Sequence, residues 1–259
     1  MNQHPSKAAF TKALTCVPLM LALVSVCFTA LSAESFAEDE KPVKKKIRWY
    51  KVEIIIFSQQ DLFNDERHIT DIELSYPDNI RSLIDSPANP SQPFIALPKD
   101  EMKLMPDRIS LDRAPGYRVL YHKMWRQPGF GIKDSPWILV QGGKATGDHH
   151  ELEGSIRLVR NRHLHIQTDL WKTKFISPNT QPSFISADQQ SWPSLPPKPD
   201  FGNQAGESQI GGHQIERNVA FNNISDIVTL KQSTRLTRNE LTYMDHPNMG
   251  IIVQVTRDE

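Results

Sequence analysis

The side chains of this sequence that could recognise a ligand are aromatic and basic, and they alternate along segments with strand composition. Aromatic rings can stack on the apolar faces of sugars, whereas arginine and lysine can pair with peptide carboxylates. The pattern indicates recognition of a polymer that carries both glycan and peptide, although aromatic residues in strands more often belong to a core. The residues concerned are Trp49, Tyr50, Tyr117, Tyr121, Trp125, Trp137 and Trp171, with Arg48, Arg118, Lys123, Arg126 and Lys172.

Two segments supply the candidate ligand contacts. One is YRVLYHKMWR at residues 117–126, and the other is the segment at 243–246 near the C-terminus. Asp245-His246-Pro247 resembles an acid–histidine pair, but between two strands it is more simply a turn, in which proline fixes one backbone angle. The predicted ligand contacts are Tyr117, Arg118, Tyr121, Trp125, Arg126, Tyr243, Asp245 and His246.

No motif for catalysis or for a cofactor is present. The sequence lacks phosphate-loop and dinucleotide fingerprints, the GxSxG elbow and the HExxH zinc motif. Four histidines could form a zinc site on paper, but adjacent strand residues point to opposite faces, so we expect neither a metal nor another cofactor. Glycoside cleavage needs two carboxyl groups at a set separation, and no local motif selects a pair. The four histidines are His149, His150, His163 and His165, and the candidate acids are Glu53, Glu151, Glu153 and Asp169.

The charges of the chain balance, with 30 basic and 30 acidic residues among 259. A domain that binds nucleic acid usually has an excess of lysine and arginine, so we expect no nucleic-acid partner. Binding to an anionic polymer would then depend on shaped recognition or on a local patch such as residues 44–48.

The N-terminus has the pattern of a secretory signal peptide. Lys7 and Lys12 precede an uncharged apolar stretch at 13–33, and Ser35-Phe36-Ala37 fits the signal-peptidase rule, so we expect cleavage after Ala37. An uncleaved membrane anchor is the alternative. Both cysteines of the chain lie inside this segment, so the mature protein has no disulfide. The pattern predicts a periplasmic protein with no stable membrane span after cleavage.

The rest of the sequence predicts one domain of the α+β class, with a mostly antiparallel sheet, short helices and long Pro-rich surface loops. Residues 38–47 are a charged tether, and 48–259 form the domain, from which 177–212 is a Pro-rich surface excursion. Alternation and turn residues predict a hairpin at 151–175 and a second one from 240–244 and 251–255. Further strands are expected at 49–57, at 117–127, at 137–140 before the stop at Gly142-Gly143, and at 228–236; short helices are expected at 79–84 and within 100–112.

Glu53 is the only acid in the apolar run at 49–57. Burying an unpaired charge costs on the order of several kcal/mol of folding free energy. We therefore expect Glu53 either to face solvent or to meet a basic partner.

In their order and combination, these segments resemble the CsiV family of peptidoglycan-binding periplasmic proteins. The resemblance is carried by WYKVEIIIF, YRVLYHKMWRQP, ELEGSIRLVRNRHLHIQTDL and RLTRNELTYMDHPNMGIIVQV, and it spans residues 49–255. It implies a non-enzymatic accessory factor of cell-wall synthesis that binds peptidoglycan and the lipoprotein activator LpoA, and thereby supports a class A penicillin-binding protein. The alternatives are a protein-interaction module without glycan binding and a peptidoglycan hydrolase. The resemblance implies no particular binding residues.

Overall fold

The computed structural model describes residues 47–59, 72–85, 91–176, 192–201 and 224–258, all within one compact unit. The predicted signal peptide, nearly all of the charged tether and most of the Pro-rich excursion lie outside these residues. No helix in the described part of the chain is long and apolar enough to cross a membrane.

The described strands form two five-stranded sheets. The first has the order β3-β4-β1-β10-β9 and the second the order β2-β5-β6-β7-β8. All pairings are antiparallel except the short parallel contact between β2 and β5. The strands are β1 (Trp49–Gln59), β2 (Ile80–Arg81), β3 (Ile95–Ala96), β4 (Tyr117–Pro128), β5 (Trp137–Thr146), β6 (His149–Arg160), β7 (Leu164–Phe175), β8 (Ile224–Leu236), β9 (Leu241–His246) and β10 (Met249–Asp258), and the helices are η1 (Lys99–Glu101) and α1 (Met105–Arg113).

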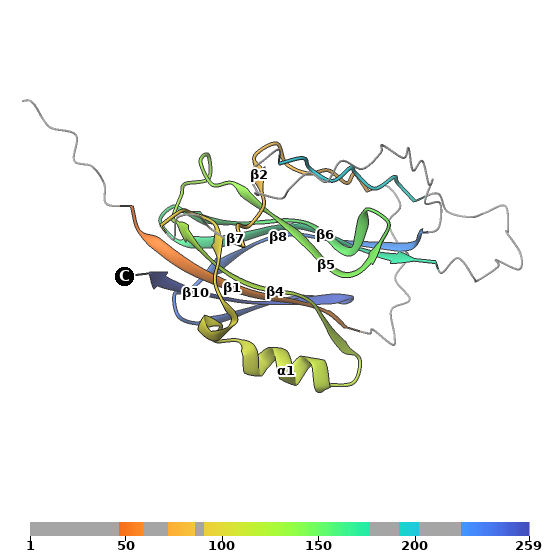
Figure 1. Cartoon of the computed structure of the whole chain (residues 1–259), viewed down its shortest axis with the longest axis horizontal. Coiled ribbons are helices and arrows are strands. Elements are labelled where there is room, and N and C mark those ends of the chain that lie inside the picture. The colour runs from red at the N-terminus through yellow and green to blue at the C-terminus, as the bar shows by residue number, and fades with distance from the viewer. Residues whose placement is uncertain (1–46, 60–71, 86–90, 177–191, 202–223, 259) are drawn as a thin grey trace, which may run out of the picture. The chain divides into compact units, whose positions relative to one another are not determined.

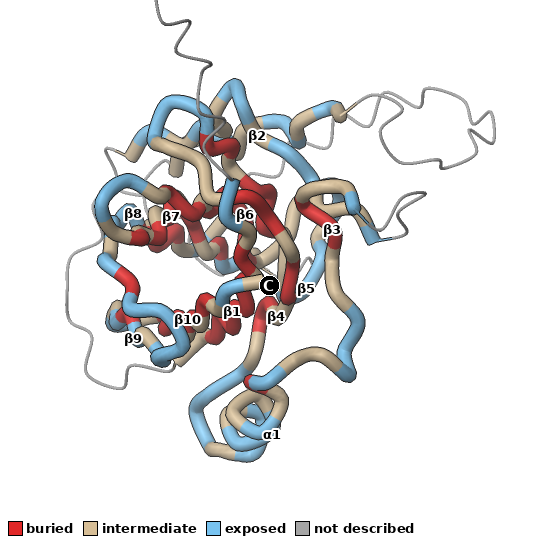
Figure 2. The backbone as a smooth tube through the Cα atoms, turned by 90° about the vertical axis from the view of Figure 1, so that its left-hand side faces the viewer, coloured by how far each residue is buried: buried red, intermediate tan, exposed pale blue. Residues whose placement is uncertain are grey.

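The two sheets pack face to face around one hydrophobic core, and Figure 2 shows the buried residues between the two layers. Alternation decides which side chains enter this core, because successive residues of a strand point to opposite faces. On β1, Val52, Ile54 and Ile56 are fully buried in it, and Ile156 and Leu158 of β6 contribute from the second sheet.

The helix α1 covers the outer face of the first sheet, as Figure 1 shows. A second cluster of buried residues lies there, formed by Ile55 and Phe57 of β1 and by Leu104 at the start of the helix. Partly buried Leu111, Val119 and Ile252 pack against it. The alternate residues of β1 are thus buried on both faces, which accounts for the near-continuous apolar run in its sequence.

The predicted fold class and most of the predicted elements are confirmed. The mostly antiparallel strands form a single described domain with short helices, although they divide over two sheets. The predicted helix at 79–84 is wrong, because this segment forms β2 beside β5 and a bridge from Ile84 to Ile95. The predicted stop at Gly142-Gly143 is also wrong: β5 continues to Thr146 through a register shift, and Gly143 adopts a positive φ of 70° there.

Gly154 in β6 has a backbone that other residues rarely adopt, with φ at +124°. A Cβ atom at this position would overlap the carbonyl of Asp169 and lie 2.8 Å from the Cα of Leu170 on the neighbouring strand. We expect Gly154→Ala to lower the free energy of unfolding by about 2 kcal/mol, from strain and overpacking together. Urea unfolding followed by circular dichroism measures this loss. Gly131→Ala is the matched control, because its Cβ would meet only Asn161 Oδ1 at 3.7 Å.

Candidate functional site

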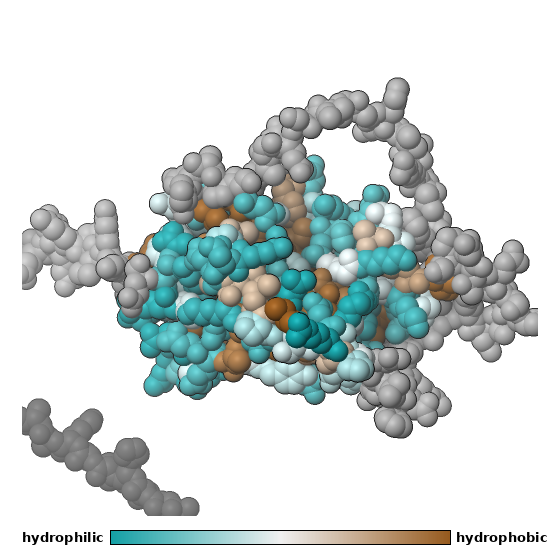
Figure 3. Space-filling model, turned by 60° about the horizontal axis from the view of Figure 1, so that its bottom comes forward, coloured by the Kyte–Doolittle hydropathy of each residue, from teal (hydrophilic) through white to brown (hydrophobic). Residues whose placement is uncertain are grey.

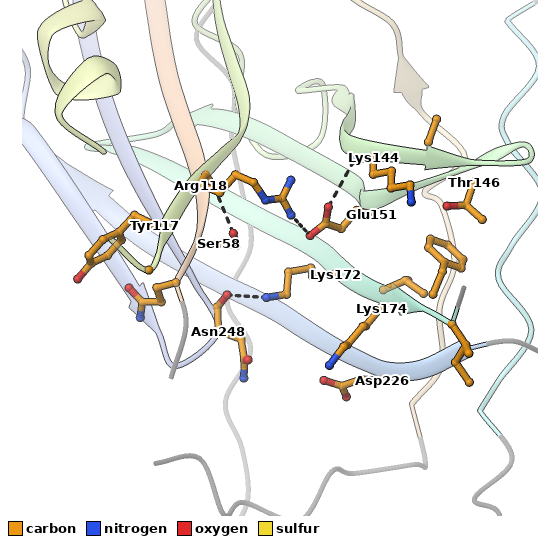
Figure 4. Close-up of a pocket in the computed structure, with 16 residues that line it drawn as sticks. Ser58, Tyr117, Arg118, Lys144, Thr146, Glu151, Lys172, Lys174, Asp226 and Asn248 are labelled. Atoms are coloured by element: carbon orange, nitrogen blue, oxygen red, sulfur yellow. Dashed lines mark hydrogen bonds and ion pairs between the residues drawn. The ribbon is translucent and has the colours of Figure 1, made fainter. Parts of the chain in front are cut away.

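A polar cleft of about 820 Å³ opens at one end of the domain, where strands of both sheets end or begin. We call it the cationic cleft, because four basic side chains face two carboxylates around it and leave an excess of two positive charges. Figure 4 shows these side chains around the opening. Its charged lining residues are Arg118, Lys144, Lys172 and Lys174 with Glu151 and Asp226.

One wall of the cationic cleft is held by Glu151 at the start of β6. Its carboxylate accepts a hydrogen bond from the guanidinium of Arg118 on the first sheet and one from the backbone N–H of Lys144, at 3.3 Å. The ion pair therefore ties the two sheets together at this end and fixes the guanidinium of Arg118 at the mouth.

Lys172, near the end of β7, lies deeper in the cleft and is half-buried. Its Nζ donates to the carbonyl oxygen of Asn248, in the turn between β9 and β10, at 2.9 Å. Burial lowers the pKa of its ammonium below the ordinary value, and the nearby carboxylates of Glu151 and Asp226 oppose this effect. One carbonyl satisfies only one of the three donors of an ammonium, so Lys172 can still donate to a ligand.

An aromatic cluster adjoins the cationic cleft. Phe57 of β1 contacts Tyr117 and Tyr243, with ring centroids 5.7 and 6.4 Å apart, and both tyrosines are about half exposed. The hydroxyl of Tyr243 donates to Asp245 Oδ1 at 2.7 Å. Burial and this hydrogen bond raise the pKa of Tyr243 to about 12, whereas the same bond lowers the pKa of Asp245.

The structure brings together five of the eight predicted contact residues. Tyr117 and Arg118 line the cationic cleft. Tyr243 lies at the same end of the domain, where its ring stacks on that of Phe57. Gln59 lines the cleft, and its Nε2 donates to Asp245 Oδ1 and to the backbone oxygen of His246.

The other three predicted contacts lie elsewhere, so we withdraw them from the candidate surface. Trp125 is fully buried, with its indole N–H bonded to Gln127 Oε1 at 2.7 Å, and Tyr121 is buried in the same core. Arg126 lies toward the opposite end of β4, where it stacks over the ring of Trp49 at 4.2 Å and pairs with Asp258. In this structure neither of the two buried rings offers a face to a ligand.

Sequence reasoning missed the contribution of the second sheet. Lys144 and Lys174 of this sheet were not predicted as contacts, and Lys172 was noted only as part of the aromatic and basic pattern; Asn248, in a turn of the first sheet, was not predicted either. One feature of the sequence could have indicated these lysines. In the predicted hairpin, Lys172 and Lys174 continue the alternate positions that are apolar earlier in the strand, so they are expected on the same face as the core residues.

The acids considered for glycoside cleavage do not form a pair around the cleft. Glu53 lies on the outer face of the first sheet under the start of α1, where it binds backbone N–H groups. Glu153 is buried against His149 and the backbone of His150, and Asp169 pairs with Lys231. Only Glu151 of these four lines the cationic cleft.

The four histidines considered for zinc are separated by the length of β6. His149 and His150 begin this strand, while His163 and His165 lie at or beyond the turn that follows its end. No group of three potential metal ligands occurs among the residues that the structure describes.

Outside the cleft, the face of the domain in Figure 3 is mostly hydrophilic, and its apolar areas are small and separate. The exposed large apolar side chains of the described chain are likewise few, and they come from different elements: Ile47, Ile109, Tyr117, Ile132, Leu241 and Tyr243. Scattered apolar residues are normal on a monomer surface and mark no broad hydrophobic interface.

Comparison with protein families gives a match over nearly the whole chain. The model of the family described as "Peptidoglycan-binding protein, CsiV" matches residues 18–258. Comparison with curated proteins and with solved structures finds no match. On the strength of the family match, this chain belongs to the CsiV family of peptidoglycan-binding proteins.

Proposed function

We propose that this protein is a non-enzymatic accessory factor of the periplasm that holds peptidoglycan in its cationic cleft. The observation that carries the proposal is the grouping of four basic side chains from both sheets around one cleft, which Tyr117 also lines. Membership of a peptidoglycan-binding family supports the same ligand.

The chemistry of the cleft suits the peptide part of the wall polymer. Stem peptides carry free carboxylates, and lysine and arginine form charge-assisted hydrogen bonds with carboxylates. Tyr117 and Tyr243 offer exposed rings at the same end, which suits the apolar face of a sugar. Because the whole chain has no net charge, such local contacts would have to hold the polymer without a general electrostatic attraction.

The proposed mechanism is recruitment, without any bond made or broken. Following the family resemblance, the second partner would be the lipoprotein activator LpoA, through which wall synthesis by a class A penicillin-binding protein is supported. A signal peptide removed after Ala37 would deliver the protein to the periplasm, where both partners occur.

Co-sedimentation with purified insoluble sacculi tests the binding function. We expect the protein to pellet with sacculi at low salt and to stay in the supernatant without them, with and without added LpoA. Protein that remains in solution in every mixture would refute peptidoglycan binding, and a pull-down of LpoA without glycan would then favour an interaction module.

Analysis of the same sacculi separates binding from catalysis. We expect the profile of soluble muropeptides to be unchanged after prolonged incubation, because Glu151, one of the two carboxylates of the cleft, is held by Arg118 and by the backbone N–H of Lys144. Release of muropeptides above the level given by heat-denatured protein would establish a hydrolase instead.

A further inference from the structure

A second charged site lies at the end of the domain opposite the cationic cleft. It is a shallow hollow of about 250 Å³, and we call it the arginine hollow. Tyr50, His163, Leu164, Leu236 and Thr237 also line it, and no carboxylate does. Its defining residues are Arg48, Arg160, Arg162, Arg235 and Arg238.

Three separate parts of the chain bring these arginines together. Arg48 immediately precedes β1, Arg160 and Arg162 lie at the turn between β6 and β7, and Arg235 and Arg238 lie at and beyond the end of β8. The cationic cleft, in contrast, contains Ser58 and Gln59 from the other end of β1. A strand of 11 residues is about 35 Å long, so the two sites are separated by about the length of the domain.

The guanidinium groups of the hollow are available to a ligand. Arg48, Arg162, Arg235 and Arg238 are exposed, and Arg160 is partly buried. None of the five forms an ion pair with a carboxylate in the part of the chain that the structure describes. Five like charges gathered without a counter-charge repel one another, which an anionic ligand would relieve. Glu240 follows in the same turn as Arg238 but does not line the hollow.

We propose that the arginine hollow docks the protein on the surface of an acidic phospholipid membrane. The planar guanidinium fork matches the oxygens of a phosphate group, and a group of basic residues at one surface is attracted to anionic headgroups. Ile47, beside Arg48, is 59% exposed and can enter the boundary between headgroups and acyl chains.

The opposite placement of the two sites gives the docking a consequence. A domain held on a membrane by the arginine hollow presents the cationic cleft away from that membrane, at a distance of about the length of a strand. The inference stands independently of what the cleft binds, because the two sites share no lining residue.

Vesicle co-sedimentation tests this proposal with the protein as cells export it. Vesicles of phosphatidylcholine with and without phosphatidylglycerol are compared at low salt, and Arg162→Gln, Arg235→Gln and Arg238→Gln are combined in one variant. We expect binding of the unchanged protein only to the acidic vesicles. The variant should have a partition coefficient about 100-fold lower, since each basic residue near an anionic surface contributes about fivefold.

The matched control removes three exposed cations outside the hollow, by Lys99→Gln, Arg113→Gln and Lys198→Gln. This control has the same net charge as the test variant, and it should bind acidic vesicles nearly as the unchanged protein does. Equal losses in both variants would overturn the proposal, because binding would then follow net charge alone. Failure of the unchanged protein to bind acidic vesicles would overturn it too. The arginine hollow would then be expected to bind an acidic protein surface instead of a membrane. Sacculus binding by the test variant should be unchanged.

Discussion

Replacing Glu53 by methionine is expected to lower the free energy of unfolding by about 4 kcal/mol, because it removes a buried carboxylate that accepts hydrogen bonds from three donors. The Glu53 side chain is 2% exposed and lies between β1 and the start of α1. Its Oε1 accepts from the backbone N–H of Leu104 at 2.9 Å, and its Oε2 from that of Lys103 at 2.8 Å. His122 Nε2 lies 2.9 Å from Oε1.

The position of Glu53 explains the size of this effect. The two backbone N–H groups belong to Leu104, the N-cap residue of α1, and to Lys103 just before it, at the end of the helix where the dipole favours a negative charge. No side chain of α1 itself caps this end. The carboxylate therefore anchors the helix from the sheet beneath it, beside the apolar anchor provided by Leu104.

Chemical unfolding measures the loss, and Glu53→Gln should fall between the two proteins because glutamine keeps one acceptor oxygen. Glu101→Gln is the matched control on the same face. Its carboxylate pairs with Lys51 at the surface, so we expect a loss of less than about 1 kcal/mol. Equal stability of Glu53→Met and the unchanged protein would contradict the anchoring role.

The pH dependence provides a second measure of the same interaction. Burial raises the pKa of Glu53, but the hydrogen bonds from His122 and from the backbone of Leu104 and Lys103 outweigh it, so the pKa lies below 4.5. A depressed pKa in the folded state stabilises the protein above the pKa of the unfolded state. The stability difference between the unchanged protein and Glu53→Gln should thus shrink as the pH falls below about 4.5 through the pKa of the folded state.

The strands and the hairpins followed from local sequence, because apolar alternation and turn residues report on a strand and its neighbour directly. The environment of Glu53 was also predicted in part. A single acid in a buried run was expected to face solvent or to meet a basic partner, and in the structure its basic partner is His122. The two backbone N–H groups could not be predicted, since Lys103 and Leu104 are about fifty residues away in the sequence.

The tyrosines of β4 show why the site was only half predictable. Tyr117, Tyr121 and Trp125 are spaced by four, so strict alternation would place all three on one face. A register shift opposite Ile56 and Phe57 inserts Leu120 as an extra residue in β4. Such a bulge moves the residues before it to the other face, which exposes Tyr117 and leaves the other two rings in the core.

The cationic cleft was even less predictable from local sequence. Its basic side chains come from β4, β5 and β7, and the register across both sheets decides that these strand ends meet. Each lysine on its own has the sequence signature of an ordinary exposed strand residue. Their common placement is a property of the sheet packing, which composition and spacing do not contain.

Removing two charges from the cationic cleft is expected to abolish most of the affinity for sacculi. In the variant Lys172→Gln with Lys174→Gln, we expect the dissociation constant to rise about 100-fold, because a hydrogen bond to a charged group contributes about 1.5–3 kcal/mol. Lys172 should account for the larger share, since it is half-buried and its charge is less screened by water than that of exposed Lys174. Titration of sacculi against a fixed protein concentration measures the change.

The control variant carries Lys231→Gln with Lys198→Gln, which removes the same charge from outside the cleft. Lys231 is 77% exposed and pairs with Asp169 on the same sheet, so its loss should change neither folding nor binding much. Because burial lowers the pKa of Lys172, binding by the unchanged protein should also weaken as the pH rises, and at a lower pH than for an ordinary lysine. The cleft variant and the control should unfold at the same urea concentration. If they also bind sacculi equally well, the polymer binds outside the cationic cleft.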